Sequence, residues 1–169
     1  TVGYSSGFYN EAPNNTYLGY FAGFGEFGRS TGGANVAVGD FALFRIRGGA
    51  QNVAIGEGAL ASDSTGSTNV SIGAGSMESH LRGNDNVAMG FWAGRTDTAA
   101  ARSMYIGRDA GYNNQRDDII AIGYQALFNN SFGATLANHG TNNMAIGNNA
   151  LASNTLGDRN VAIGNNALN

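Results

Sequence analysis

The residues that could do chemistry in this 169-residue chain are few. Gly3-Tyr4-Ser5-Ser6-Gly7 satisfies the G-x-S-x-G pattern, which exposes a serine nucleophile on a turn between a strand and a helix. Gly23-Phe24-Gly25-Glu26-Phe27-Gly28 satisfies the G-x-G-x-x-G pattern, whose glycines let the backbone approach a pyrophosphate at a helix start. No helical pattern follows the first string, whose Gly3 and Ser6 belong to a repeat described below, and among 27 glycines the spacing of the second string arises by chance. We therefore expect neither a hydrolase nor a dinucleotide site.

The two histidines, His80 and His139, lie far apart in variable segments, and the chain has no cysteine to complete a metal site. We expect both to be water-exposed loop residues. Asp117 and Asp118 are adjacent acids without the alternating Asp and Gly of calcium-binding repeats, so we expect a solvated corner. The sequence thus predicts no catalytic residue, no metal and no cofactor.

The amino-acid composition excludes several classes of protein. The chain is 42% hydrophobic and 12% charged, with one Pro and no Cys, which fits neither a collagen, nor a disulfide scaffold, nor a disordered tail. Its nine cationic residues are all Arg and the net charge is −3, so we expect no nucleic-acid partner. No apolar run approaches the roughly 18 residues needed to span a membrane, so we expect no membrane insertion.

A repeat of about 17 residues organises the whole chain. Each unit has an anchor glycine preceded by an apolar residue and followed, three positions later, by Ala or Ser. The anchors are Gly3, Gly19, Gly39, Gly56, Gly73, Gly90, Gly107, Gly123, Gly147 and Gly164. Asn usually stands four positions before the anchor, and a second Gly often stands seven before it. The unit is G-x-x-N-V-A-I-G-x-x-A-L followed by about five variable residues.

This unit predicts a stack of short strands. Val-Ala-Ile is bounded by Asn and Gly, which favours a strand of three to five residues and then a turn, whereas the frequent Gly argues against helices. One unit buries too little apolar surface to fold alone, so the units must stack. Side chains alternate along a strand, so we expect Val53 and Ile55 to fill the coil interior with Leu60, and Ala54 to face outwards.

Two features of the unit have their own physical explanations. The recurring Asn is explained equally well by a hydrogen-bonded ladder from coil to coil and by the turn chemistry of Asn. The anchor Gly indicates a corner with positive φ or a close backbone approach.

The repeat resembles known fibre repeats. Asn52-Val53-Ala54-Ile55-Gly56 and Asn160-Val161-Ala162-Ile163-Gly164 are similar to repeats of phage tail fibres and to the head repeats of trimeric autotransporter adhesins. The pattern runs from Val2 to Leu168. The resemblance implies an all-β, parallel β-roll or β-solenoid, with about ten coils here, assembled as a homotrimer. The 17-residue period favours a phage-type fibre over the adhesin heads, whose period is shorter.

The expected function follows from that resemblance. It implies a non-catalytic structural and adhesive segment of an extracellular fibre, on a virion and involved in host attachment, with other fibre or particle proteins as partners. The first alternative is the head domain of a bacterial autotransporter adhesin on the cell surface. The second is an acyltransferase of the hexapeptide-repeat class, although the required six-residue aliphatic spacing fails: six and twelve positions after Ile55 come Ala61 and Ser67.

Candidate contacts with a cell-surface glycan or protein lie in the variable positions. Phe91 and Trp92 replace the usual polar pair after an anchor, at a corner expected to face outwards. The spacing from Gly123 to Gly147 is 24, which indicates an insertion near 128–140 that projects as a loop. Its candidate contact residues are Asn129, Asn130, Phe132, Asn138 and His139. The alternative for Phe91 and Trp92 is packing against a neighbouring chain, and the alternative for the insertion is an inert, solvated loop.

The chain divides into two regions by sequence. Residues 1–30 are degenerate leading repeats that hold eight of the 17 aromatic residues, and residues 31–169 form the regular array. We expect the leading rings to cap the roll or fill the trimer axis, with ligand binding as the alternative.

Overall fold

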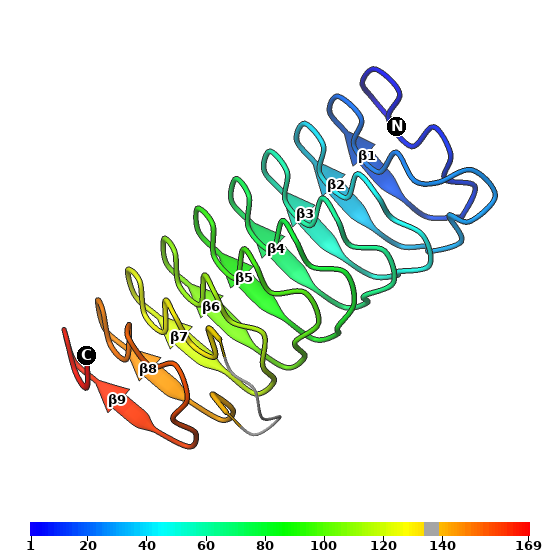
Figure 1. Cartoon of the computed structure of the whole chain (residues 1–169). Coiled ribbons are helices and arrows are strands. Elements are labelled where there is room, and N and C mark those ends of the chain that lie inside the picture. Colours follow the sequence, from blue (N-terminus) through cyan, green and yellow to red (C-terminus); the bar gives the residue numbers. More distant parts are fainter. Residues whose placement is uncertain (134–138) are drawn as a thin grey trace.

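A computed structural model describes residues 1–133 and 139–169. Within these residues nine strands of three residues lie parallel in one sheet, each paired with the next along the chain. The strands are β1 (Thr16–Leu18), β2 (Val36–Val38), β3 (Val53–Ile55), β4 (Val70–Ile72), β5 (Val87–Met89), β6 (Met104–Ile106), β7 (Ile120–Ile122), β8 (Met144–Ile146) and β9 (Val161–Ile163). Figure 1 shows the coils stacked into an elongated body with the termini at opposite ends. The prediction of an all-β, parallel β-solenoid is confirmed.

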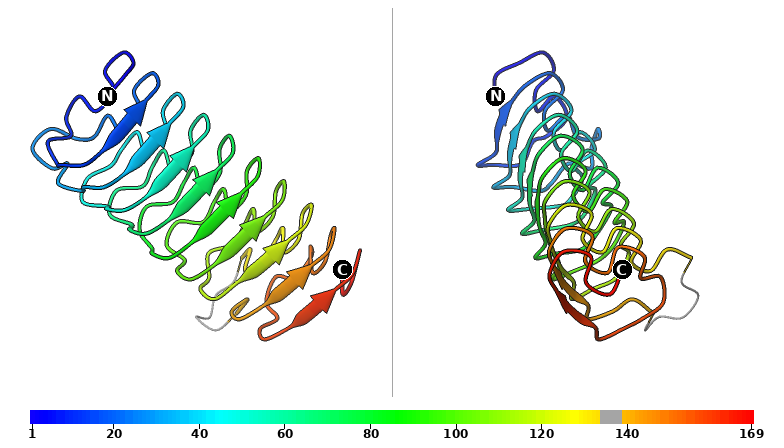
Figure 2. Two further views of the ribbon diagram at one scale, coloured as in Figure 1. Left: turned by 180° about the vertical axis from the view of Figure 1, so that it is seen from behind. Right: turned by 90° about the vertical axis from the view of Figure 1, so that its left-hand side faces the viewer.

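Each strand occupies the same place in its coil. The Val-Ala-Ile segment of β3 pairs in register with the Val-Ser-Ile segment of β4, so that Val53 lies beside Val70 and Ile55 beside Ile72. The repeat therefore advances one coil per unit (Figure 2). We expected about ten coils; the first unit, anchored at Gly3, contributes only an isolated bridge between Val2 and Leu18.

The anchor glycines combine a positive φ with a close approach of the neighbouring backbone, the two explanations that the sequence indicated. Gly56 has φ +132, and a Cβ on it would lie 2.6 Å from the carbonyl carbon of Gly73 in the next coil. An L side chain at this position would thus meet both an unfavourable φ and a backbone contact. These glycines let the chain turn sharply at the end of each strand while the coils remain closely stacked.

The expected orientation of the strand side chains is wrong. Ala54 is completely buried, whereas Ile55 is 39% exposed and Val53 half-buried. The same pattern, with the central residue of the strand inside and its two neighbours outside, holds in all nine described strands. The turn at the anchor glycine brings the returning chain across the inner face of the strand, where little space remains. Small residues therefore line the interior and bulky ones the outside.

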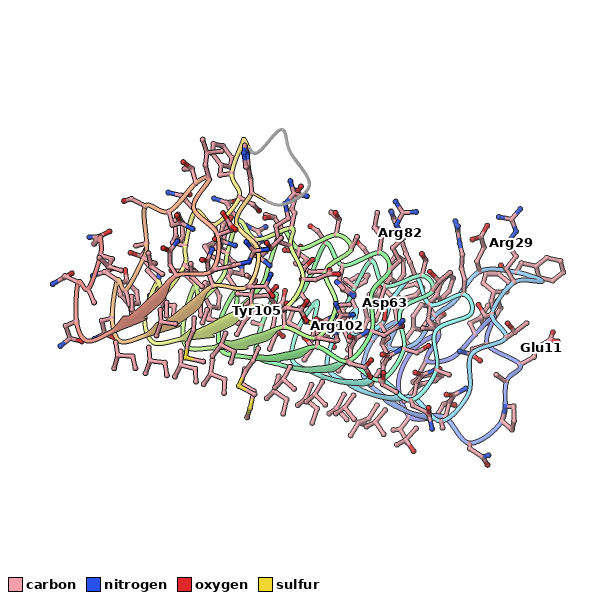
Figure 3. All side chains as sticks on the ribbon, turned by 90° about the horizontal axis from the view of Figure 1, so that it is seen from below. Glu11, Arg29, Asp63, Arg82, Arg102 and Tyr105 are labelled. Atoms are coloured by element: carbon pink, nitrogen blue, oxygen red, sulfur yellow. The ribbon has the colours of Figure 1, made fainter. Side chains whose placement is uncertain are left out.

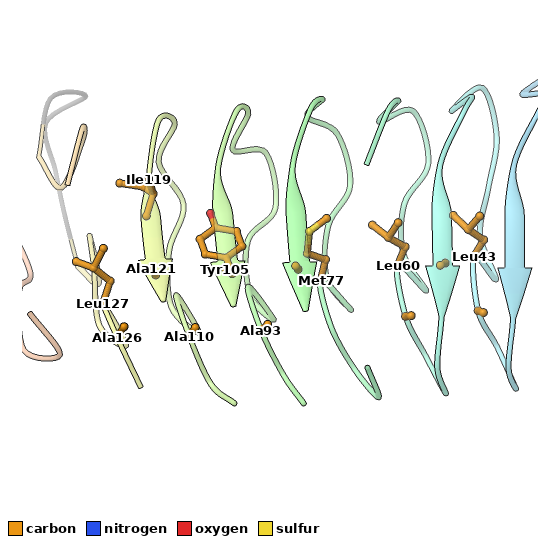
Figure 4. Packing of buried hydrophobic residues seen from close by; sticks show 14 of the residues in the cluster. Leu43, Leu60, Met77, Ala93, Tyr105, Ala110, Ile119, Ala121, Ala126 and Leu127 are labelled. Atoms are coloured by element: carbon orange, nitrogen blue, oxygen red, sulfur yellow. The ribbon is translucent and has the colours of Figure 1, made fainter. Parts of the chain in front are cut away.

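The interior consists of columns of equivalent residues from successive coils. The small residue three positions after the anchor is buried, as in Ala59 and Ala93, and packs near the central strand residue. The next residue, such as Leu43, Leu60 or Leu127, fills the remaining space and is fully buried (Figure 4). The prediction that Leu60 lies in the interior is confirmed.

The recurring Asn forms a ladder through the coil stack. The Oδ1 atom of Asn52 accepts a 2.9 Å hydrogen bond from the backbone N–H of Asn69, and the Nδ2 atom of Asn52 donates to the carbonyl oxygen of Gly66 at 2.8 Å. The ladder thus joins mainly side chain to backbone, and it uses the second Gly of the unit as the acceptor. The residue before each Asn has positive φ, as Gln51 does at φ 59, so a turn accompanies the ladder.

Candidate interaction surfaces

The outer face of the sheet is apolar along its length. It is formed by the first and third residue of every strand, and in the described chain 17 of these 18 residues are Val, Ile, Leu or Met. Thr16 is the exception. Figure 3 shows this row of side chains projecting from the strands, while Arg29 and Arg82 lie on the opposite side of the solenoid. With eight spacings of about 4.8 Å the face is roughly 38 Å long. An apolar strip of this length is unusual on an isolated chain.

The leading aromatic residues form stacked columns on the outside of the first coils. Tyr4 stacks on Tyr20 with ring centroids 5.5 Å apart, and Phe24 stacks on Phe44 at 5.4 Å. Tyr4 is 70% exposed. These rings therefore lie outside the coil interior, with the exception of Tyr17, which is buried inside the coil, and their role as a cap of the roll stays a prediction. Whether they lie at a trimer axis stays a prediction.

Phe91 and Trp92 lie together at an outward corner, as expected. Their ring centroids are 4.3 Å apart, Phe91 is 40% exposed and Trp92 is half-buried. The guanidinium of Arg95 lies 4.6 Å from the Trp92 ring centroid, close enough for a cation–π interaction. The Nε atom of Arg95 donates to Glu78 at 2.7 Å, and this bond raises the pKa of Arg95.

The insertion residues do not form one surface. Phe132 is 65% exposed, but Asn130 is fully buried and its Nδ2 atom donates to Asn114 and to the carbonyl of Gly140, so its assignment as a receptor contact is wrong. Asn129 is half-buried and accepts a hydrogen bond from Asn113 at 2.9 Å. Asn130 is buried because it stands seven residues after its anchor, a position that faces the interior in every regular coil.

The remaining insertion residues lie at the end of the loop. His139 is half-buried, and its backbone carbonyl accepts a 3.0 Å bond from Arg116. The other candidate contact, Asn138, lies outside the described residues. Of the candidate contacts that the structure describes in this insertion, Phe132 is the one clearly presented to solvent.

The interior position seven residues after the anchor forms a polar column. It holds Asp63, His80 and Asp97 in successive coils, all fully buried, so the expectation that His80 is an exposed loop residue is wrong. The Nδ1 atom of His80 lies 3.9 Å from Oδ1 of Asp97, whose other oxygen accepts a 3.0 Å bond from Tyr105. Sequence reasoning missed this column because its members differ in type; the signal was their constant place in the unit.

Burial controls the protonation of this column. It raises the pKa of Asp63 to about 7, partly offset by the backbone N–H of Gly66, which donates to Oδ1 at 2.8 Å. Burial also raises the pKa of Asp97, against the opposing effect of His80. Oδ2 of Asp63 and Nδ1 of His80 have no hydrogen-bond partner within the described structure. The column thus places two carboxyl groups with raised pKa values inside the solenoid.

Neither the exposed acids nor the two strings that match catalytic motifs lie in a cluster of potential metal ligands within the described residues. Asp117 and Asp118 are solvated and both pair with Arg102, at 3.3 and 2.7 Å. The string around Ser5 lies in turns and the string around Gly25 in turns and irregular backbone, and no helix occurs in residues 1–133 or 139–169. In those ranges no cluster of three or more potential metal ligands exists. Nor does any helix there have the length and hydrophobicity to cross a membrane.

Protein-family models, curated proteins and solved structures give no match to this chain. Its function must therefore be argued from the surfaces described above.

Proposed function

We propose that this chain is a structural and adhesive segment of an extracellular trimeric fibre, carried on a phage tail or another virion, that contributes to host attachment and performs no catalysis. The observation that carries the proposal is the outer sheet face. Its residues, from Leu18 to Ile163, form an uncharged strip that is left open to water in the single chain. Burying it against other chains recovers the favourable free energy of removing apolar surface from water.

A homotrimer is the partner arrangement that we propose for this face. The strip runs parallel to the long axis of the solenoid (Figure 1), so copies that stand side by side bury it along their whole length. Three copies around one axis form a closed assembly that leaves no strip exposed. The repeat resemblance to trimeric fibres supports the same arrangement. Other fibre or particle proteins then join the rod at its ends.

The variable turns of the coils fit a rod that also attaches to a host surface. Each coil adds one turn with variable side chains on the side away from the sheet face, so a trimer presents every such turn three times. Threefold presentation strengthens weak binding by about 10² to 10⁴ through avidity. A bacterial adhesin head is the alternative from the same resemblance, and a coiled-coil stalk with a membrane anchor in the full-length protein would favour it.

The test is the mass of the purified chain by light scattering, with small-angle scattering for its shape. We expect a rod of three times 17.4 kDa. Ile72→Glu with Ile106→Glu places two charges in the centre of the sheet face and is expected to give folded monomers. Arg82→Glu changes the charge at an exposed position on the opposite side of the solenoid and should leave the trimer intact. A native chain that stays a 17.4 kDa monomer at high concentration contradicts the proposal.

A further inference from the structure

A hollow lies between the leading aromatic columns and the Phe91–Trp92 corner. The residue two positions after the anchor is Phe41 and then Trp92 at the two sides of this region, but Gly58 and Gly75 in the two coils between them. Two adjoining cavities of about 340 and 210 Å³ result, which share Glu57, Gly58 and Glu78 in their walls. Phe41 and Phe44 bound the first cavity, and Phe91 and Trp92 bound the second.

The backbone does not require glycine at these two positions. Gly58 has φ +64, and the equivalent Phe41 and Trp92 adopt φ 58 and 57 with large side chains. A Cβ on Gly58 would have no atom within 4 Å, so the space above it is open. A Cβ on Gly75 would lie 2.8 Å from Nε1 of Trp92, so the indole leans over Gly75 towards the hollow. The missing side chains therefore create the hollow.

Three polar groups at this hollow are unused. Within the described chain, the carboxylate of Glu57, the guanidinium of Arg45 and the indole N–H of Trp92 have no hydrogen-bond or ion-pair partner. Glu57 and Arg45 are exposed to solvent, Trp92 partly so. The hollow thus offers both donors and an acceptor to a ligand.

The charges of the lining cancel. Arg45 and Arg95 oppose Glu57 and Glu78, and the pair of Arg95 with Glu78 is already closed at 2.7 Å. A strongly charged ligand would gain attraction from one sign and repulsion from the other. A neutral ligand whose hydroxyl groups both donate and accept can use all of the unused groups.

We propose that this hollow binds a neutral oligosaccharide, which stacks on Phe41 and Phe44 at one end and on Trp92 at the other, with its hydroxyl groups bonded to Glu57 and Arg45. Sugar rings have apolar faces that pack on aromatic rings and polar edges that form hydrogen bonds. Phe41 and Trp92 are three coils apart, about 14 Å, which a short chain of sugar rings spans. The inference rests on the adhesive part of the proposed function and adds the ligand class and its site.

The experiment uses Trp92 as a probe, because it is the single tryptophan of the chain. We would record its fluorescence and its indole ¹H–¹⁵N resonance while titrating maltotriose, cellotriose, lacto-N-tetraose and triacetylchitotriose, with 3′-sialyllactose and a sulfated disaccharide as anionic comparisons. At least one neutral oligosaccharide is expected to shift the indole signal saturably at millimolar concentrations or below. Its affinity should exceed that of the anionic compounds.

Two variants locate the binding. Gly58→Phe fills the hollow with a residue that the equivalent Phe41 shows to be tolerated, and should weaken binding about tenfold or more. Asn149→Phe makes the same addition at the equivalent position of a distant coil and should not change binding. Circular dichroism confirms that both variants are folded.

Three results would overturn the proposal: an indole signal unchanged by every neutral oligosaccharide, preferential binding of the anionic compounds, or equal binding by Gly58→Phe. Light scattering on the same samples tests the trimer independently, because a native chain that forms trimers but binds no neutral oligosaccharide refutes the site and leaves the proposed assembly standing.

Discussion

The ring of Tyr105 occupies space that Gly94, in the preceding coil, leaves empty. A Cβ on Gly94 would lie 2.6 Å from Cδ2 of Tyr105, and Gly111 in the ring's own coil meets the opposite side of the ring in the same way. Most other coils have Ala at the position of Tyr105, as in Ala54, and Leu where Gly94 and Gly111 stand, as in Leu60. The other tyrosine at this position, Tyr17, again lies against two glycines, Gly7 and Gly23. The interior volume is thus kept constant by paired changes at two positions of the repeat.

This relationship predicts a strong coupling between the paired positions. Gly94→Leu alone should destabilise the fold by about 1–3 kcal/mol or more, because the new side chain overlaps the Tyr105 ring. Combining Gly94→Leu and Gly111→Leu with Tyr105→Ala restores the packing of the regular coils, so the triple variant should be more stable than the sum of its changes by about 1–3 kcal/mol. Denaturant unfolding measures both. Strict additivity would contradict the paired packing.

The buried Asp63 predicts that stability falls with rising pH. Its pKa is about 7 in the fold and near 3.8 in the unfolded chain. Below about pH 4 both states hold the proton and the stabilisation is complete; between pH 4 and 7 only the folded state retains it, so the free energy of unfolding decreases. Above pH 7 the loss is complete, on the order of 4 kcal/mol.

Asp63→Asn isolates this contribution. Asn occupies the same position of the unit in four other coils, at Asn10, Asn114, Asn130 and Asn154, and the amide oxygen keeps the bond from Gly66. The variant should match the native chain at pH 4 and exceed its stability at pH 8 by a few kcal/mol, as judged by thermal unfolding at both values. Asp118→Asn, at an exposed site, is the control. If Asp63→Asn and the native chain had the same thermal unfolding curves at both pH values, ionisation of Asp63 would not destabilise the fold.

The Asn ladder predicts a clear difference between buried and exposed amides. Asn69→Ala removes the acceptor of the Asn86 backbone N–H and the donor to Gly83. Each buried group left unpaired costs about 1–3 kcal/mol, so a loss of about 2–5 kcal/mol is expected. Asn165→Ala removes one exposed bond, to the backbone N–H of Asn148, and should cost less than about 1 kcal/mol. Unfolding by urea compares the two, and equal losses would argue against the ladder as a source of stability.

The sequence predicted the repeat period and the anchor geometry because both depend on local residue types, whereas the parallel sheet was implied by the resemblance of the repeat to fibre repeats. The φ of Gly56 and the burial of Leu60 follow from such local chemistry. It did not predict that Ala54 faces inwards, because alternation gives two faces without saying which is inside. That choice depends on how closely the chain returns after Gly56, a distance that no residue pattern states. The hollow above Gly58 was missed for a related reason, since it arises from side chains absent in two neighbouring coils.

The last prediction concerns the insertion. Deleting residues 131–137 brings Asn130 within three residues of Gly140, the spacing of Asp63 and Gly66 in a regular coil. Asn130 is retained because it bonds to Asn114, Gly140 and Asn143 inside the coil. The deletion loses the bond from the Gln115 N–H to Ser131 and shortens a loop whose closure costs little, so we expect a stability change of about 1 kcal/mol or less.

Attachment measurements distinguish an inert loop from one that contacts the target surface. If the loop is inert, the deletion variant keeps its oligosaccharide binding and the assembled fibre keeps its attachment to the target surface. Phe132→Ala, which truncates the exposed ring without changing the loop length, is the matched variant. Because the described candidate contacts of this insertion do not form one surface, we expect full attachment from both variants. Attachment lost in both, with the trimer and the indole response intact, would instead make Phe132 part of a recognition surface separate from the hollow at Gly58.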